Sequence, residues 1–205
     1  RSRRLASAIA ERDIGRGDAV SVLLPNVPAM LEAHHGVPMS GAVLHAINTR
    51  LDAATIAFQL DHCKSRMLIV DRALLSLAEA ALELCEVTPA LVLYDDPEWN
   101  SASDADRLVQ PVLSADRWQD YEDMISRGDP NFEWLMPQDE WDAIAISYTS
   151  GTTGDPKGVV THHRGAYLLA QGNALIATMP RHATYLWTLP MFHCNGWCFP
   201  WTLSV

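Results

Sequence analysis

The chain has 205 residues, of which 48% are hydrophobic, and it carries a formal charge of −10 at pH 7. This composition predicts a globular domain that buries roughly 70% of its unfolded surface, and it argues against a disordered chain. The negative charge argues against generic nucleic-acid or anionic-membrane binding. No apolar run approaches the roughly 18 residues that a membrane span needs.

The cysteines and the first residues suggest a compartment. Cys63, Cys85, Cys194 and Cys198 are scattered, without the density of a disulfide framework. The opening "RSRRLASAIAERD" has too short an apolar stretch for a signal peptide. We therefore expect a reducing, cytoplasmic location.

The first 95 residues alternate between amphipathic segments typical of helices and continuous apolar runs typical of buried strands. Pro28 favours a helix start, and Thr49 and Asp52 offer caps for the next helix. Strands that alternate with helices in this way predict an α/β fold, in which helices cover both faces of a parallel sheet. The expected helices cover residues 3–14, 27–41, 53–63 and 73–84, and the expected strands cover 19–25, 42–48, 66–71 and 90–95.

The pattern lapses between residues 95 and 139, which are acidic and contain one convincing helix at 118–127. We interpret this stretch as a surface excursion rather than a second domain. Regular elements return with strands at 143–150 and 158–161 and a helix at 163–178. His162 and His163 are expected to open that helix, and His34 and His35 to be ordinary helix residues.

Both ends of the chain look cut, because it begins inside a helix without Met and stops in the apolar stretch "FPWTLSV". We therefore expect it to be a piece of a longer protein.

The segment "SYTSGTTGDPKGVV" at 147–160 concentrates hydroxyl residues, glycines and a lysine between two apolar runs. Glycines let backbone N–H groups approach a ligand, hydroxyls donate hydrogen bonds, and lysine adds a positive charge, so the segment suits a polyphosphate. It does not fit the G-x-x-x-x-G-K-[ST] template. Gly151 and Gly154 are only three apart, and Gly158 follows Lys157 where a hydroxyl is required.

The stretch "YTSGTTGDPKGV" at 148–159 resembles the phosphate loop of the adenylate-forming superfamily, to which acyl-CoA synthetases belong. Three further stretches agree: "THHRGAYLL" at 161–169, the βαβ-like segment at 20–51, and "LPMFHCNGWCFPW" at 189–201. The resemblance covers essentially the whole chain. The wording "PMFHxNGW" looks closest to the medium-chain acyl-CoA and methylmercaptopropionate-CoA ligase branch. The resemblance implies that residues 1–205 are part of the large N-terminal AMP-binding domain, and that the C-terminal domain is absent.

The resemblance also implies two half-reactions. A small-molecule carboxylic acid, expected to be a fatty or small thio-substituted acid, attacks the α-phosphate of Mg²⁺-ATP to give acyl-AMP and pyrophosphate, and the thiol of coenzyme A then displaces AMP. Donors and a lysine stabilise the charge that builds on pyrophosphate as it leaves. By resemblance, Thr149 lies near magnesium and Lys157 neutralises phosphate charge. The residues that would surround the β- and γ-phosphates are Ser150, Gly151, Thr152, Thr153 and Gly154.

Two residues of the later motif are further candidates. By resemblance, His193 and Trp197 border the acyl pocket, and His193 also lies near the α-phosphate. For Trp197 a place in the core is the alternative, and Phe199 and Trp201 are expected to be core residues. Lys157 is one of only two lysines, beside Lys64, in a chain with thirteen arginines. That scarcity is suggestive of a functional role.

Several alternatives stay open. The chain could be a non-catalytic module that holds phosphate groups, or part of another adenylating enzyme, such as a luciferase-like or peptide-synthetase adenylation domain. His193, Cys194 and Cys198 do not match a structural-zinc spacing, and no G-x-S-x-G turn indicates a serine triad. We expect the 205 residues alone to be inactive, and a homodimer is compatible with the sequence.

Overall fold

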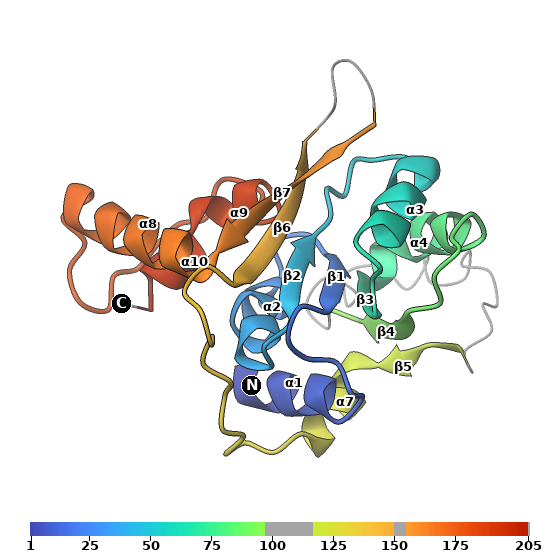
Figure 1. Ribbon diagram of the computed structural model, residues 1–205, viewed down its shortest axis with the longest axis horizontal. Coiled ribbons are helices and arrows are strands. Elements are labelled where there is room, and N and C mark those ends of the chain that lie inside the picture. The colour runs from blue at the N-terminus through green and yellow to red at the C-terminus, as the bar shows by residue number, and fades with distance from the viewer. Residues whose placement is uncertain (97–116, 150–154, 205) are drawn as a thin grey trace.

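The structure is a computed structural model that describes residues 1–96, 117–149 and 155–204. One seven-stranded sheet has the strand order β5-β4-β3-β1-β2-β6-β7 (Figure 1). The strands are β1 Ala19–Leu23, β2 Val43–Ala46, β3 Met67–Asp71, β4 Ala90–Tyr94, β5 Gln119–Asp120, β6 Ala143–Thr149 and β7 Lys157–His162. The helices are α1 Ser2–Ala10, α2 Pro28–Met39, α3 Ala53–His62, α4 Leu75–Leu82, α7 Tyr121–Arg127, α8 His163–Ile176, α9 Cys194–Trp197 and α10 Phe199–Thr202, and the 3-10 turn η1 Arg72–Leu74 precedes α4.

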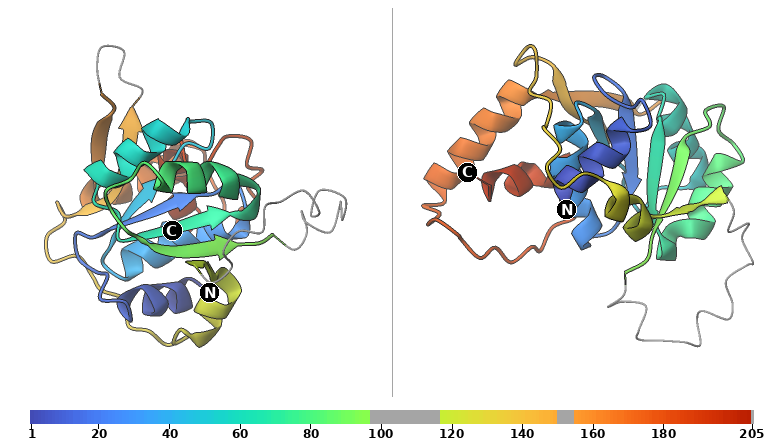
Figure 2. Two further views of the ribbon diagram at one scale, coloured as in Figure 1. Left: turned by 90° about the vertical axis from the view of Figure 1, so that its right-hand side faces the viewer. Right: turned by 90° about the horizontal axis from the view of Figure 1, so that it is seen from below.

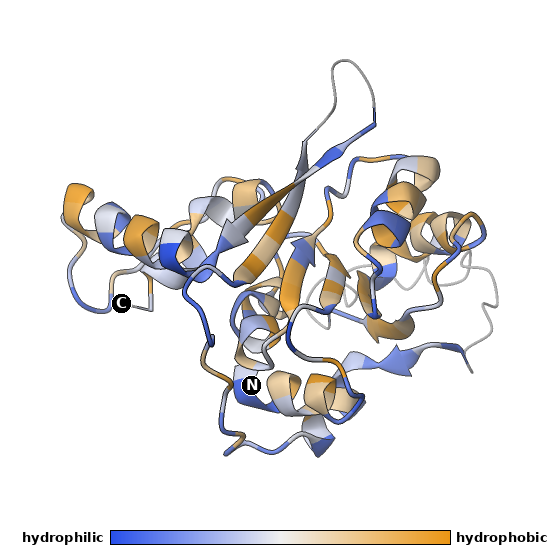
Figure 3. Ribbon diagram, viewed as in Figure 1, coloured by the Kyte–Doolittle hydropathy of each residue, from blue (hydrophilic) through white to orange (hydrophobic). Residues whose placement is uncertain are grey.

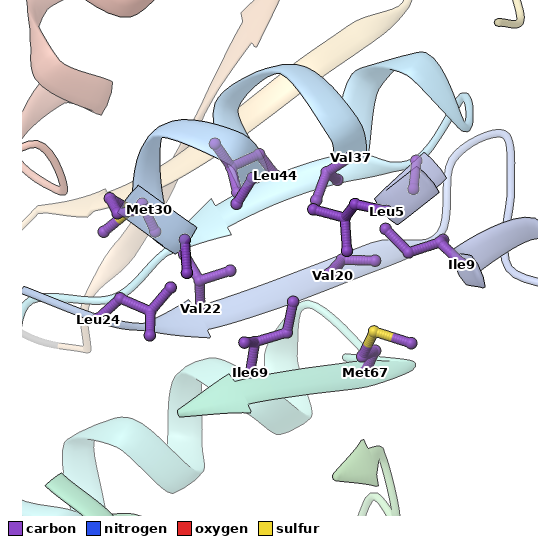
Figure 4. Close-up of a cluster of buried hydrophobic side chains, with 14 of the residues drawn as sticks. Leu5, Ile9, Val20, Val22, Leu24, Met30, Val37, Leu44, Met67 and Ile69 are labelled. Carbon is purple, nitrogen blue, oxygen red and sulfur yellow. The ribbon is translucent and has the colours of Figure 1, made fainter. Parts of the chain in front are cut away.

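The central strands are buried on both faces, which explains their continuous apolar sequences. Successive side chains of a strand point to opposite faces. In β1, Val20 and Val22 therefore enter one core cluster, while Leu23 enters the cluster on the other face. Figure 4 shows Val20 and Val22 between the strands and the helix that carries Val37. The expected fold class, an α/β sheet covered on both faces, is confirmed.

Helices cover the sheet as two layers (Figure 2). Helices α1, α2 and α7 lie on one face, and α3 and α4 lie on the other. Pro28 opens α2, where its missing N–H costs nothing. Asp52 caps α3 by accepting a 2.8 Å hydrogen bond from the backbone N–H of Thr55. Of the two caps that the sequence offered for α3, Asp52 is the one that is used.

Residues 95–139 were expected to lie on the surface, outside the core. This expectation is wrong for residues 118–125, which pack against the sheet. Residues 119–120 form the short strand β5, which pairs parallel with β4, and α7 begins only at Tyr121. Tyr121 is 1% exposed, and Trp118 is buried against the opposite face. Asp120 caps α7 through a 2.8 Å bond from the backbone N–H of Asp123. The segment therefore completes the core instead of lying outside it.

The sheet is parallel except at one edge, where β7 runs antiparallel to β6. The connection from β6 to β7 spans only residues 150–156. A parallel crossover needs a dozen or more residues, so a link this short can only join antiparallel strands. Helix α8 follows β7 at once, with His162 as its N-cap and His163 as its first residue, as expected.

Helix α8 and strand β7 expose apolar side chains. Leu175 and Ile176 are 78% and 88% exposed at the far end of α8, where the ribbon in Figure 3 is coloured orange for hydrophobic residues. Val159 and Val160 of β7 are also exposed. Apolar exposure of this extent is typical of a contact surface. Among the described residues, no helix is both long and apolar enough to cross a bilayer.

Candidate active site

The candidate site lies at the carboxyl edge of the sheet. Strands β1, β2 and β6 run parallel, so their carboxyl ends lie at the same edge. Ligands of open α/β sheets bind at this edge. Asn26 lies three residues after the end of β1, and Thr149 ends β6. The expected phosphate loop begins directly after Thr149, and the segment at 189–201 is hydrogen-bonded to Asn26.

The first motif is held by the β6–β7 hairpin. Thr149 lies opposite Lys157 in the antiparallel ladder, and both residues are exposed. Lys157 is exposed, and within the part of the chain that the structure describes it forms no ion pair. The stem of the expected phosphate loop is thus a strand pair that presents a hydroxyl and a positive charge side by side.

The loop between these two residues stays a prediction. Ser150, Gly151, Thr152, Thr153 and Gly154 lie outside the described residues, so their expected contacts with the phosphates are not tested.

The hydroxyl of Thr149 is an oxygen donor, the type of ligand that Mg²⁺ prefers. Its hydroxyl offers one oxygen, and Mg²⁺ usually takes one or two protein oxygens together with waters and substrate phosphates. Across residues 1–96, 117–149 and 155–204, no group of three or more His, Cys, Asp and Glu side chains could hold a metal ion.

The second motif is fixed to the end of β1 by a single side chain. The amide nitrogen of Asn26 donates to the backbone oxygen of Leu189, and its amide oxygen accepts from the backbone N–H of Met191, both at 2.8 Å. The two bonds bracket Pro190 and lie two residues before His193. Asn26 was missed by sequence reasoning, because its partners are more than 160 residues away.

His193 and Trp197 come together on a short turn. Their ring centroids are 6.1 Å apart at 78°, an edge-to-face arrangement, and both side chains are exposed. Cys194, Gly196 and Trp197 have φ values of 43°, 61° and 55°, so the turn winds in the left-handed sense. Backbone in this region is strained for residues other than glycine, and such strain clusters at functional sites. Trp197 is 48% exposed, so in this chain it is not a core residue.

The rest of this motif anchors the turn to the core. Phe199 is half-buried and stacks on Tyr185, with ring centroids 4.7 Å apart. Trp201 packs against the core, and its indole N–H donates to the backbone oxygen of His34 at 2.8 Å. His34 is fully buried in α2, and this burial lowers its pKa to about 4. Turn α9 in turn lies against β6, the strand that carries Thr149. Phe199 and Trp201 were expected in the core, and the structure places both side chains in partly buried positions.

A buried polar network lies beneath the hairpin, and the sequence analysis did not identify it. The hydroxyl of Ser21 and Nδ1 of His45 are 2.8 Å apart, and Nε2 of His45 lies 3.3 Å from the amide oxygen of Gln59. Ser65 donates to the Ser21 hydroxyl at 2.8 Å. Burial lowers the pKa of His45 to about 4, which keeps the ring neutral at physiological pH. The available signal was a polar residue inside each of two apolar strand runs.

A separate apolar groove of about 620 Å³ lies at the other end of β6. Its lining includes His35 of α2, Ile144 near the start of β6, Tyr167 of α8 and Trp201. Thr149 lies five residues further along β6 than Ile144. The groove is therefore distinct from the phosphate-loop stem, and it is not the candidate nucleotide site.

The AMP-binding enzyme family matches residues 1–205, and the similar proteins include acid–CoA ligases. The acetate/butyrate–CoA ligase AAE7, peroxisomal, of Arabidopsis thaliana is 51% identical over 212 residues, which cover 100% of this chain and 36% of that enzyme. The 2-methylpropanoate–CoA ligase CCL4 of Humulus lupulus is 45% identical, with 98% and 35% covered. A long-chain-fatty-acid–CoA ligase structure from Archaeoglobus fulgidus superposes with a TM-score of 0.78 at 21% identity, covering 100% of this chain and 37% of that one.

These relatives bear on two expectations, the location of the protein and the share of it that this chain represents. The cytoplasmic location is contradicted, because the Arabidopsis ligase is peroxisomal by name. The chain spans about a third of the length of the relatives that it matches. The finer placement in the medium-chain acyl-CoA and methylmercaptopropionate-CoA branch stays a prediction. Because the family match extends from the first residue to the last, the chain belongs to the AMP-binding enzyme family.

Proposed function

We propose that the full-length protein is an AMP-forming acid–CoA ligase that activates a short aliphatic carboxylic acid. The observation that carries the proposal is the meeting of two motifs at one strand. Strand β6 carries Thr149 of the Thr149–Lys157 stem, and the turn α9, which follows His193 and ends at Trp197, contacts the same strand. The relatives named for acetate, butyrate and 2-methylpropanoate support a small acid. ATP and coenzyme A are the co-substrates that such a ligase requires.

Each candidate residue then has a physical role. Lys157 neutralises the charge that develops on the departing pyrophosphate, and Thr149 gives magnesium one oxygen ligand. Residues 150–154 donate hydrogen bonds to the β- and γ-phosphates. His193 lies beside the α-phosphate, and Trp197 forms a wall of the acyl slot. Residues 1–205 are part of the N-terminal AMP-binding domain, and the C-terminal domain belongs to the rest of the protein.

The test is thioester formation by the full-length protein with ATP, Mg²⁺, coenzyme A and acids from acetate to octanoate. We expect acyl-CoA from acids of two to four carbons, and a steep fall for longer acids. Absence of any thioester across the series would overturn the proposal. Lys64→Ala is the matched control for Lys157→Ala, because Lys64 is the other lysine and is exposed elsewhere on the surface.

The same assay separates the alternatives. A peptide-synthetase or luciferase-like adenylation domain would form acyl-AMP without passing the acid to coenzyme A. A non-catalytic module would bind nucleotide phosphates and form neither product. Residues 1–205 expressed alone should release no pyrophosphate. The expected homodimer is tested by the mass of the full-length protein in solution.

A further inference from the structure

Tyr148 precedes Thr149 in β6, and its hydroxyl contacts a helix that packs on the sheet. The Tyr148 hydroxyl and Nδ1 of His62 are 2.7 Å apart, although the two residues are 86 positions apart in sequence. His62 is the last residue of α3 and stacks on Phe58, with ring centroids 5.6 Å apart at 25°. The contact thus joins the hairpin to the end of α3, a helix that covers one face of the sheet.

The ring of Tyr148 is confined by its neighbours as well. Its edge contacts His45 at a centroid distance of 5.1 Å, and His45 is fixed by the buried network with Ser21 and Gln59. Across the hairpin, Tyr148 is paired with Gly158. A Cβ at Gly158 would lie 2.8 Å from Cδ1 of Ile146 and 3.5 Å from Cε1 of Tyr148. The glycine therefore leaves room for these two side chains to cover β7.

This contact matters because β6 extends past the residues that pair with β2. Strand β2 pairs with β6 only at Ala145 and Ile146. Within the described residues, the backbone ladder from Ser147 to Thr149 pairs with β7, and the hairpin extends beyond β2 (Figure 1). A two-stranded ribbon is marginally stable by itself in water. The contact between Tyr148 and His62 ties this ribbon to the rest of the domain.

We propose that Tyr148, held by His62, is a positioning residue for the adenylation half-reaction. It fixes the end of β6, and with it the Thr149 hydroxyl and the facing Lys157, relative to the sheet. This inference rests on the proposed function, because the stem must act on ATP for its position to affect catalysis. Neither side chain touches the reacting atoms, so the contribution is geometric. A displacement of about 1 Å at a site of this kind is enough to slow a reaction substantially.

The test uses the full-length protein and measures its two half-reactions separately. Tyr148→Phe removes the hydroxyl and keeps the ring against His45. His62→Leu removes the partner. His62→Asn retains a polar atom near the position of Nδ1. We expect the first two variants to raise the KM for Mg²⁺-ATP in acid-dependent pyrophosphate exchange by roughly 3- to 10-fold, the range of one neutral hydrogen bond. Thioester formation from supplied acyl-AMP should not change, and His62→Asn should restore most of the loss.

A double variant and a control separate positioning from simple stability. Because both single changes break the same contact, Tyr148→Phe with His62→Leu should be no worse than either alone. Tyr121→Phe is the matched control, because it removes a hydroxyl that donates to Glu32 at 2.7 Å on the other face of the sheet. It should lower stability without changing the KM for Mg²⁺-ATP.

Three results would overturn the inference: unchanged exchange kinetics in both single variants, equal losses in both half-reactions, or additive losses in the double variant. An active wild type with unaffected variants refutes the inference alone. A wild type without acid-dependent exchange refutes the proposed function, and the inference with it.

Discussion

Asn26 offers a sharp test of how the candidate acyl site is built. Its side chain makes two 2.8 Å hydrogen bonds to the backbone of Leu189 and Met191. Asn26→Ala removes both. Each such bond contributes about 0.5–1.5 kcal/mol, and the lower half of that range applies here because Asn26 is exposed. The two bonds together therefore contribute about 1–2 kcal/mol. Their loss shifts the equilibrium between the bound and the released position of residues 189–191 by roughly 5- to 30-fold toward the released one.

This shift should appear on the acid side of the reaction, because the segment leads directly into His193 and Trp197. We expect Asn26→Ala to lower kcat/KM for the acid by about 5- to 30-fold, with the KM for Mg²⁺-ATP changed much less. Steady-state kinetics of the full-length protein, with each substrate varied in turn, measures both values.

Asn26→Asp makes the prediction more demanding. The carboxylate has nearly the same shape and still accepts from the N–H of Met191, but it places an oxygen against the backbone oxygen of Leu189. Its activity should therefore be no better than that of Asn26→Ala. Wild-type acid kinetics in Asn26→Asp, or equal effects on acid and ATP, would refute the reasoning.

Four further outcomes are expected. Lys157→Ala should slow acyl-AMP formation by on the order of 10²-fold and leave thioester formation from supplied acyl-AMP nearly unchanged; equal losses in rapid-quench assays of the two steps would contradict its role. Trp197→Ala should shift the preference in kcat/KM toward longer acids and, because Trp197 is 48% exposed, should cost less stability than the 3–5 kcal/mol, roughly, of a core tryptophan in thermal unfolding. His34 and His45 have pKa values lowered to about 4, below the unfolded value near 6.5, so protonation favours unfolding. The contribution of each neutral histidine to the free energy of unfolding is complete above pH 6.5, roughly, and falls toward pH 4 by about 1.4 kcal/mol per pH unit. In His45→Gln, the urea midpoint of unfolding should therefore depend less on pH, between about pH 8 and 5, than in the wild type. Gly196→Ala should loosen the turn and raise the KM for the acid, because φ is 61° there and a Cβ would lie 2.8 Å from the Trp187 ring; an unchanged melting temperature and KM would show that the turn tolerates the change.

The sequence predicted the local elements well, because each depends on a pattern that is local in the chain. The run around Val20 is apolar on both sides of the strand, and this matches a strand that is buried on two faces. Asp52 caps the helix that its position predicted. The glycine–hydroxyl segment lies between a strand and a short second strand, as expected, and the family match supports the resemblance.

What the sequence did not predict depends on contacts between distant residues. The pair Gln119–Asp120 is polar, and it becomes a strand only because β4 lies beside it. Asn26 looks like an ordinary turn residue until its two partners beyond position 188 are known. Ser21 and His45 were two isolated polar residues in apolar strands, and only the pairing of β1 with β2 shows them as one buried network.

Acid-dependent exchange of labelled pyrophosphate into ATP, measured on the full-length protein without coenzyme A, tests the central claim most directly. Exchange requires the carboxylate to form acyl-AMP reversibly, which is the step assigned to the β6–β7 stem and the His193–Trp197 turn. The account predicts exchange that depends on a short aliphatic acid and on Mg²⁺, and that is nearly abolished in Lys157→Ala but retained in Lys64→Ala. Thioester formation that yields ADP and phosphate, with no exchange for any acid, would contradict it.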